Sequence, residues 1–171
     1  MLLCLRGPDI AIQTAGANGK LELDFAIDRT GRVAPAHAAR YAEFGAWIRQ
    51  CYGSPVARTT PAPGAREVVL ALPPGVAIDR VMIQEDQTNG QCVAGYIVDA
   101  FAGGEWTVVA RGVTIGNKRI EVFAAPIVAS VVRLTVTDVF DRPTLSNFAA
   151  FAPQPCALPS TAVRAGMFVF L

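Results

Sequence analysis

The sequence predicts a mainly β protein: an antiparallel β-sandwich or jelly roll preceded by one strand–helix unit. Between residues 78 and 151, apolar and polar side chains alternate with a period of two, as at Val132 and Leu134 around Arg133. Turn formers separate these short runs, most clearly at Gly103-Gly104 between two strand-like segments. Short, evenly spaced strands with no helical period among them are typical of antiparallel sandwiches.

The composition is that of a folded protein. A chain of 171 residues allows one domain, or one domain with a part of another. It is 52% hydrophobic and 17% charged, which excludes a mainly disordered chain. A formal net charge of +1 offers no electrostatic footprint for nucleic acid. No apolar run approaches the roughly 20 residues of a membrane span, so we expect none. Residues 1–5 begin like a signal peptide, but residues 6–9 interrupt the apolar run, so we expect no signal peptide.

Residues 20–53 predict the strand–helix unit. Leu21 and Leu23 alternate with Glu22, which predicts a strand at about 20–27. A helix is predicted at about 35–51, because Pro35 suits a first helical turn and apolar residues then recur at helical spacing. The apolar residues on that face are Tyr41, Phe44, Ile48 and Cys51, with Trp47 beside them.

Glycine and proline mark the boundaries of the remaining segments. Residues 54–65 are predicted to be a linker, residues 66–152 the sandwich and residues 153–171 a tail. The strands predicted within the sandwich are 66–72, 80–84, 92–101, 105–111, 119–123 and 132–137.

The cysteines and the histidine indicate neither a metal site nor a cofactor. The four cysteines form no Cys-x-x-Cys pair, so a zinc site is not expected. Buried or incidental free thiols are favoured, and one disulfide with unassigned partners stays open. The sole histidine, His37, has no partner motif, and Asp86 with Asn89 has too few oxygen ligands for calcium. We therefore expect no metal and no cofactor.

Several motifs of the predicted sandwich, in the same order and spacing, resemble those of one enzyme family. They are residues 78–86, 90–91, 104–106, 112–120, 132–134 and 143–146. Together they resemble the C-terminal β-sandwich of α-L-fucosidases, the glycoside hydrolases of family 29. That sandwich is of the discoidin-like, galactose-binding-like (F5/8 type C) kind, so the resemblance implies the same fold here.

The segment before the linker resembles the same family. Residues 21–33 and 39–49 are similar to the last strand and helix of the family's (β/α)8 barrel. The resemblance implies that residues 1–53 are a remnant of the barrel's C-terminal end. The family usually has Asn at the position of Asp24 and Pro at those of Ala26 and Ile27. Because such a strand end faces the active site of a barrel, Asp24 is a candidate sugar contact. The resemblance also implies a lysosomal or extracellular setting.

The catalytic groups of the family are not expected in this chain. A retaining glycosidase needs two carboxyl groups, a nucleophile and an acid/base, about 5–5.5 Å apart. In the family both come from barrel strands upstream of the equivalent of residue 20. We therefore predict no catalytic residue and no hydrolysis by this chain alone. The alternative is α-L-fucosidase activity in a longer product, once a catalytic barrel completes the site.

A fucosylated or other glycan is the partner predicted for the sandwich. Proteins hold sugars on an aromatic platform beside polar groups. The candidate sugar-binding residues are Glu85, Asp86, Trp106, Lys118 and Arg119. Three alternatives stay open: Trp106 in the core, an ion pair between Glu85 and Arg119, and a purely structural or adhesive sandwich. We expect the chain to be an accessory region, which binds carbohydrate or supports a barrel.

Overall fold

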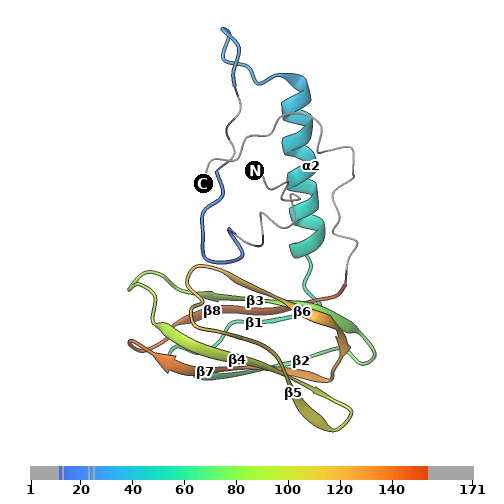
Figure 1. Ribbon diagram of the computed structural model, residues 1–171, viewed down its shortest axis with the longest axis vertical. Coiled ribbons are helices and arrows are strands. Elements are labelled where there is room, and N and C mark those ends of the chain that lie inside the picture. The colour runs from blue at the N-terminus through green and yellow to red at the C-terminus, as the bar shows by residue number, and fades with distance from the viewer. Residues whose placement is uncertain (1–11, 13, 23, 25, 154–171) are drawn as a thin grey trace, which may run out of the picture.

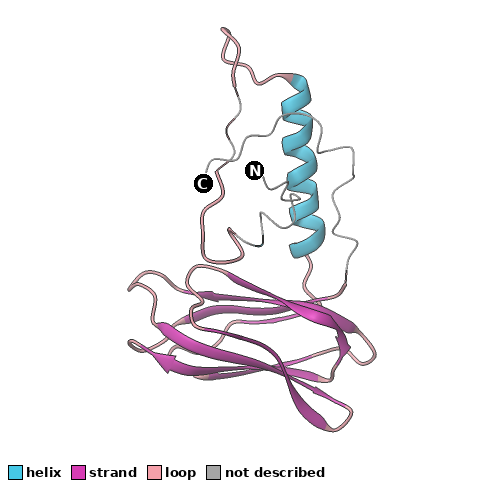
Figure 2. Cartoon of the chain, in the orientation of Figure 1, coloured by secondary structure: helices cyan, strands magenta, loops and turns pink. Residues whose placement is uncertain are grey.

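Strands dominate the part of the chain that the computed structural model describes, which is residues 12, 14–22, 24 and 26–153. A long helix, α2 (Pro35–Tyr52), precedes the strands and stands over one side of them (Figure 1). Figure 2 shows that the described residues after α2 form strands and loops. The strands are β1 (Ala57–Thr59), β2 (Glu67–Ala71), β3 (Ala77–Glu85), β4 (Val93–Ala102), β5 (Glu105–Gly112), β6 (Arg119–Val128), β7 (Val131–Val139) and β8 (Leu145–Phe151).

The strands form two four-stranded sheets that face each other, and we call these two layers the sandwich. The first sheet has the order β1-β8-β3-β6 and the second has the order β2-β7-β4-β5. Every pair of neighbouring strands is antiparallel. The prediction of a mainly β chain with antiparallel sheets and one helix is therefore confirmed.

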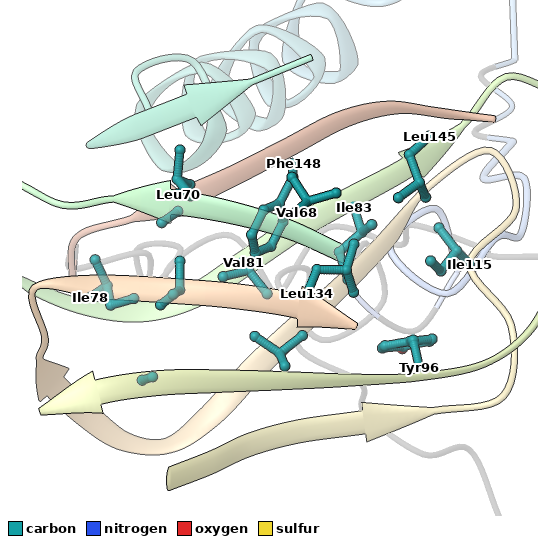
Figure 3. Packing of buried hydrophobic residues seen from close by; sticks show 14 of the residues in the cluster. Val68, Leu70, Ile78, Val81, Ile83, Tyr96, Ile115, Leu134, Leu145 and Phe148 are labelled. Atoms are coloured by element: carbon teal, nitrogen blue, oxygen red, sulfur yellow. The ribbon is translucent and has the colours of Figure 1, made fainter. Parts of the chain in front are cut away.

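One hydrophobic core lies between the two sheets (Figure 3). The first sheet contributes Val81, Ile83 and Phe148, and the second contributes Tyr96 and Leu134, all of them buried. In β2 the buried and exposed residues strictly alternate, because one face meets the core and the other meets solvent. The two-residue hairpin between β4 and β5 also follows the prediction.

Gly103 and Gly104 close that hairpin with positive φ angles of 62° and 90°. The pairing of Ala102 with Glu105 leaves only the two glycines in the turn. Two consecutive positive φ angles match the right-handed twist of the flanking strands, and glycine adopts them without steric cost.

The helix forms where the sequence predicts it. Pro35 opens α2, and the N–H of Gly53 caps its end by donating to the Arg49 carbonyl at 2.8 Å. A proline costs nothing in the first turn because its missing N–H would have had no helical partner there. No described helix is long and apolar enough to cross a membrane.

The described residues differ from two local predictions. The described residues between 20 and 27 form no strand, and Ile27 makes only an isolated bridge with Val33. A strand needs neighbours that supply hydrogen bonds, and in a barrel these would be other strands. Conversely, β1 lies inside the predicted linker, where Arg58 pairs with Ala149 of β8. The predicted tail, apart from Pro153, and the signal-like start lie outside the described residues.

Candidate functional site

The residues predicted to bind sugar lie at opposite ends of the sandwich. Those residues are Glu85, Asp86, Trp106, Lys118 and Arg119. β4 connects the two ends: the N–H of Val93 donates to Glu85, and Phe101 pairs with Trp106. At roughly 3.3 Å per residue, the eight steps from Val93 to Phe101 separate these ends by about 26 Å. The structure thus keeps Trp106 apart from the other four residues, and one monosaccharide cannot touch both groups.

Glu85 is a buried acceptor for backbone amides. Its Oε1 accepts hydrogen bonds from the N–H groups of Cys92 and Val93, both at 3.0 Å. Its Oε2 accepts one from the N–H of Gly116 at 2.7 Å. The carboxylate therefore joins the loop before β4 to the loop before β6. With 3% of its surface exposed, Glu85 offers no group to a ligand in this conformation.

The ion pair between Glu85 and Arg119 that the sequence left open does not form. The backbone amides occupy both oxygens of Glu85, while Arg119 donates from Nε to Oε1 of Glu121 at 2.8 Å. Glu121 lies two residues along the same strand, and so on the same face as Arg119. The hydroxyl of Tyr96 donates to the same Glu121 oxygen. Burial and this carboxylate together raise the pKa of the Tyr96 phenol.

An N-terminal segment covers the start of β6. The N–H of Asn18 donates to the Lys118 carbonyl at 2.8 Å, and Oδ1 of Asn18 accepts from the N–H of Asn117 at 2.6 Å. The N–H of Ile120 donates to the Gly16 carbonyl at 2.7 Å. Residues 14–19 thus lie against the loop that holds two of the predicted sugar contacts, and their backbone groups there already have partners.

The two remaining predicted carboxylates are exposed. Oδ1 of Asp86 accepts from the N–H of Thr88 at 2.9 Å and from its hydroxyl at 2.6 Å. These two hydrogen bonds lower the pKa of Asp86, the hydroxyl contributing more than the N–H. Asp24 is exposed on an irregular segment. A role for either carboxylate in sugar binding stays a prediction.

Trp106 lies on the outer face of the second sheet, and 43% of its surface is exposed. The alternative that places it in the core is therefore wrong. Its ring centroid lies 5.2 Å from that of Phe101, its cross-strand neighbour, with the planes tilted by 54°. The guanidinium of Arg133 lies 4.2 Å from the indole centroid. At this distance the cation is attracted to the face of the ring and helps to fix its orientation.

Two carboxylates hold Arg133 in this position. Its Nη2 donates to Oδ2 of Asp99 at 3.2 Å, and its Nη1 lies 4.0 Å from Oε2 of Glu67. Sequence reasoning did not assign a role to Asp99, Glu67 or Arg133. Alternation alone puts Arg133 on the polar face of its strand, but only the strand order reveals which residues lie beside it. We call Trp106, Phe101, Arg133, Asp99 and Glu67 the Trp106 face.

An open cavity of about 260 Å³ lies at the same end of the sandwich. It is bounded by the turns after β2 and β6 and by the β4–β5 hairpin, including Pro74, Gly103 and Ser130. Phe101 also lines it, and therefore links the cavity to the Trp106 face.

Arg80 joins the first sheet to the end of α2. Its side chain is buried, with Nη1 2.5 Å from Oδ1 of Asp79 and Nη2 donating to the Cys51 carbonyl at 2.9 Å. The guanidinium lies 5.3 Å from the ring centroid of Tyr52 and 5.7 Å from that of Phe151. A carbonyl near the end of a helix is an acceptor in need of a partner, and Arg80 provides a charged one.

Aromatic rings continue this joint along the helix. The ring of Tyr52 packs edge-on against Phe151, with 5.6 Å between the ring centroids, and against Trp47, with 6.1 Å. The ring of Trp47 in turn stacks on that of Phe44, with 5.8 Å between their centroids. Trp47 is only 5% exposed. The end of α2 therefore contacts the first sheet at Arg80 and Phe151, whereas the outer side of the second sheet is open at the Trp106 face.

Part of the apolar face of α2 is itself uncovered. Tyr41 is 59% exposed and Ile48 is 40% exposed. They lie seven residues apart, two helical turns, and so on one line along the helix. We call Tyr41 and Ile48 the α2 ridge.

The cysteines differ from one another. Cys51 is disulfide-bonded, so the preference for free thiols is wrong at this position. Cys92 is a buried free thiol, and burial followed by the Glu85 and Asp141 carboxylates raises its pKa. Among the described residues, no three His, Cys, Asp or Glu side chains gather into a possible metal site.

The architecture of the chain is similar to that of several solved structures. A protein of Bacteroides thetaiotaomicron named as an α-L-fucosidase has a TM-score of 0.80 and 31% identity, over 86% of this chain and 33% of its own. One of Bacteroides ovatus, named likewise, has a TM-score of 0.72 and 31% identity, over 86% of this chain and 26% of its own. A family 29 fucosidase of Ruminococcus gnavus in complex with fucose has a TM-score of 0.71 and 23% identity, over 86% of this chain and 36% of its own. No protein-family model matches the chain, and no curated protein matches it.

These structural neighbours are α-L-fucosidases, among them members of glycoside hydrolase family 29. The chain spans about a third of the length of the first neighbour and about a quarter of the second. The matched share of this chain is larger than the sandwich, so the similarity includes part of the segment before it.

Proposed function

We propose that the chain is the C-terminal accessory region of an α-L-fucosidase-like glycoside hydrolase, and that it supports a catalytic barrel. The observation that carries this proposal is the similarity at 31% identity over 86% of the chain but only 33% of the relative. On this proposal the sandwich is galactose-binding-like, of the discoidin kind, and residues 1–53 are the end of the barrel. The proposed boundaries remain a linker over residues 54–65, which includes β1, and a tail over residues 153–171.

The α2 ridge is the surface that would meet the barrel. Tyr41 and Ile48 are exposed, whereas Trp47 and Cys51 of the same helix are buried. Large apolar side chains aligned on a helix stabilise a fold when a second apolar surface removes them from water. The neighbouring strands and helices of a barrel would supply that surface, since a last helix of this kind covers the barrel's outer side.

The test is a chimera in which this chain replaces the matched C-terminal third of the Bacteroides thetaiotaomicron relative. Activity is measured on an aryl α-L-fucoside, and folding is followed by thermal unfolding. We expect a soluble chimera that hydrolyses the fucoside, because the relative contributes the remaining barrel. A Tyr41→Asp chimera should unfold at lower temperature and lose activity in proportion, since a charge at the covered ridge costs desolvation energy.

Ala46→Asp is the matched control, because Ala46 is exposed on the opposite side of α2. It should leave the chimera's unfolding temperature within about 2 °C of the parent, as expected for a surface substitution. A chimera that folds and works equally well with Tyr41→Asp would contradict support through the α2 ridge. A relative that keeps full stability and activity without any C-terminal region would contradict the accessory role itself.

Carbohydrate binding by the sandwich is the second role we propose, and the exposed indole of Trp106 favours it. Hydrolysis of α-L-fucosyl linkages is proposed only for the product completed by a barrel. The disulfide at Cys51 supports an oxidising compartment, in line with the lysosomal or extracellular setting that the resemblance implies. A sandwich with neither sugar nor barrel as partner would have only the structural role that the sequence left open.

A further inference from the structure

We propose that the Trp106 face is a binding site for a neutral glycan, with one sugar ring stacked on the free face of Trp106. This inference rests on the proposed sugar-binding role of the sandwich, and adds the place and the class of sugar. It moves the predicted site away from Glu85 and Arg119, whose side chains bind groups of the protein itself, and from Lys118, which lies next to Arg119 at the other end of the sandwich.

The indole is open on one side only. The guanidinium of Arg133 lies 4.2 Å from the ring centroid, and its Nε is fully buried with no hydrogen-bond partner among the described residues. The guanidinium therefore covers one face of the ring. The exposed 43% of Trp106 therefore belongs to the opposite face and the rim. An open, flat indole is the surface on which the C–H side of a pyranose ring packs.

The ring is also held in place before any ligand arrives. Phe101 contacts it from the paired strand at 5.2 Å, and Arg133 is itself fixed by a 3.2 Å hydrogen bond to Asp99. An aromatic side chain that is already ordered loses little rotamer freedom on binding, so more of the contact energy remains as affinity.

Glu67 supplies the acceptor for sugar hydroxyl groups. It is exposed on the same outer face, and its Oε2 lies 4.0 Å from Nη1 of Arg133, too far for a hydrogen bond. Its oxygens can therefore accept hydrogen bonds from a ligand without breaking one in the protein. Arg133, 30% exposed at its side chain, supplies donors from its Nη atoms beside the same carboxylate. Because Arg133 covers the other face of the indole, this acceptor and this donor would serve hydroxyl groups of the glycan that reach past the rim of the ring.

The charges of the face favour a neutral ligand. Two carboxylates, Glu67 and Asp99, surround the single guanidinium of Arg133. A sugar carboxylate or sulfate placed here would be repelled, because the excess charge of the face is negative.

The cavity beside Phe101 has room for little more than one further sugar residue. Its volume of about 260 Å³ lies below the roughly 300–1,000 Å³ of pockets that enclose drug-sized ligands. It is lined mainly by small and apolar residues, with Ser130 as a polar side chain. We assign to it the residue of the glycan next to the one stacked on Trp106.

The test is a titration of the full 171-residue chain with methyl β-D-galactoside, methyl α-L-fucoside and the anionic methyl β-D-glucuronide. The chain has two tryptophans, and Trp47 is 5% exposed, so acrylamide quenching of fluorescence reports mainly on Trp106. A neutral glycoside should protect the fluorescence from quenching, and the glucuronide should not. NMR titrations of the variants then give the affinities.

Trp106→Ala should weaken binding at least about tenfold, whereas Trp106→Phe, which keeps a ring and confirms folding, should weaken it less. Glu67→Gln should weaken binding of the neutral glycoside and reduce the discrimination against the glucuronide. Phe140→Ala is the matched control, because Phe140 is an aromatic residue 79% exposed at the other end of the sandwich. The affinity of the Phe140→Ala variant for the neutral glycoside should stay within about twofold of that of the parent chain.

The outcomes separate the two proposals. Neutral binding that Trp106→Ala leaves unchanged would overturn the Trp106 face but keep a sugar-binding sandwich. Equal binding of the glucuronide would overturn the neutral class. No binding of either neutral glycoside at tens of millimolar would overturn the site and the sugar-binding role together, while the chimera tests the accessory role separately.

Discussion

The guanidinium of Arg80 lies 5.3 Å from the ring centroid of Tyr52, a contact that joins the first sheet to the last turn of α2. The same side chain donates to the Cys51 carbonyl and is buried by the ring of Phe151. A charge taken out of water is tolerated only where hydrogen bonds and ring faces replace the lost hydration. Arg80 is thus the residue through which helix and sandwich become one unit.

Replacing Arg80 with methionine tests this joint. Arg80→Met keeps much of the apolar volume but leaves the Cys51 carbonyl and Asp79 without this partner. We expect the free energy of unfolding in urea to fall by about 2 kcal/mol, the cost of losing one member of a buried charged pair that is partly accessible. Arg58→Met, at an exposed position of β1, should change it by less than about 0.5 kcal/mol. Equal losses of stability in the two variants would show that Arg80 does not join α2 to the first sheet.

Replacing Glu85 with glutamine tests the amide-binding carboxylate. Its two oxygens accept from three N–H groups, and an amide side chain would place an NH2 group against at least one of them. We expect Glu85→Gln to lower the free energy of unfolding by about 1–3 kcal/mol, the cost of an unsatisfied buried donor. Glu105→Gln, an exposed position on β5, is the control and should be nearly neutral. A neutral Glu85→Gln variant would argue that the loops do not depend on this carboxylate.

The alternation of apolar and polar residues was enough to predict the strands that are buried on one face only. Val132 and Leu134 alternate with Arg133, and β7 is a strand with those apolar residues inward. β8 carries no such signal because it is buried on both faces, and Asn147, Phe148 and Ala149 are all buried. β1 depends on β8 for its hydrogen bonds, and so its three residues resembled a linker.

The site residues show the same limit of sequence reasoning. Trp106 was found because it follows a hairpin whose turn type its two glycines determine. The partners of Glu85 could not be found, because Gly116 lies 31 residues away and meets it only through the folding of two loops. The predicted strand at about 20–27 failed for the opposite reason: its alternation is real, but the described chain gives it no neighbouring strand.

The N-terminal segment should protect the loop before β6. Oδ1 of Asn18 accepts from the N–H of Asn117 at 2.6 Å, and Asn18 Nδ2 donates to Gln91. We expect Asn18→Ala to speed hydrogen exchange at the Asn117 amide, since its acceptor is removed, while amides of β4 stay protected. Asn89→Ala, in an exposed turn, is the control. Unchanged exchange at Asn117 would contradict the docking of residues 14–19.

Tyr96 should make the chain sensitive to alkali. Its pKa is raised above the ordinary value of 10.0, first by burial and then by the carboxylate of Glu121. Above about pH 10 the unfolded chain loses this proton while the folded chain keeps it, so stability falls as pH rises. In Tyr96→Phe the fall between about pH 9 and 11 should be shallower, by up to about 1.4 kcal/mol per pH unit. Urea unfolding at several pH values measures how the free energy of unfolding changes with pH in the parent and in the variant. The two slopes should be parallel near neutral pH. Parallel slopes in alkali would contradict the raised pKa.

The central claim is that this chain is an accessory region without catalytic groups of its own. Turnover of an aryl α-L-fucoside by the purified 171-residue chain, with its ends confirmed by intact mass, tests that claim most directly. The account predicts no hydrolysis above that of buffer. Hydrolysis that persists through purification and disappears in an Asp24→Ala variant would contradict it, because carboxylates of this chain would then form a working site.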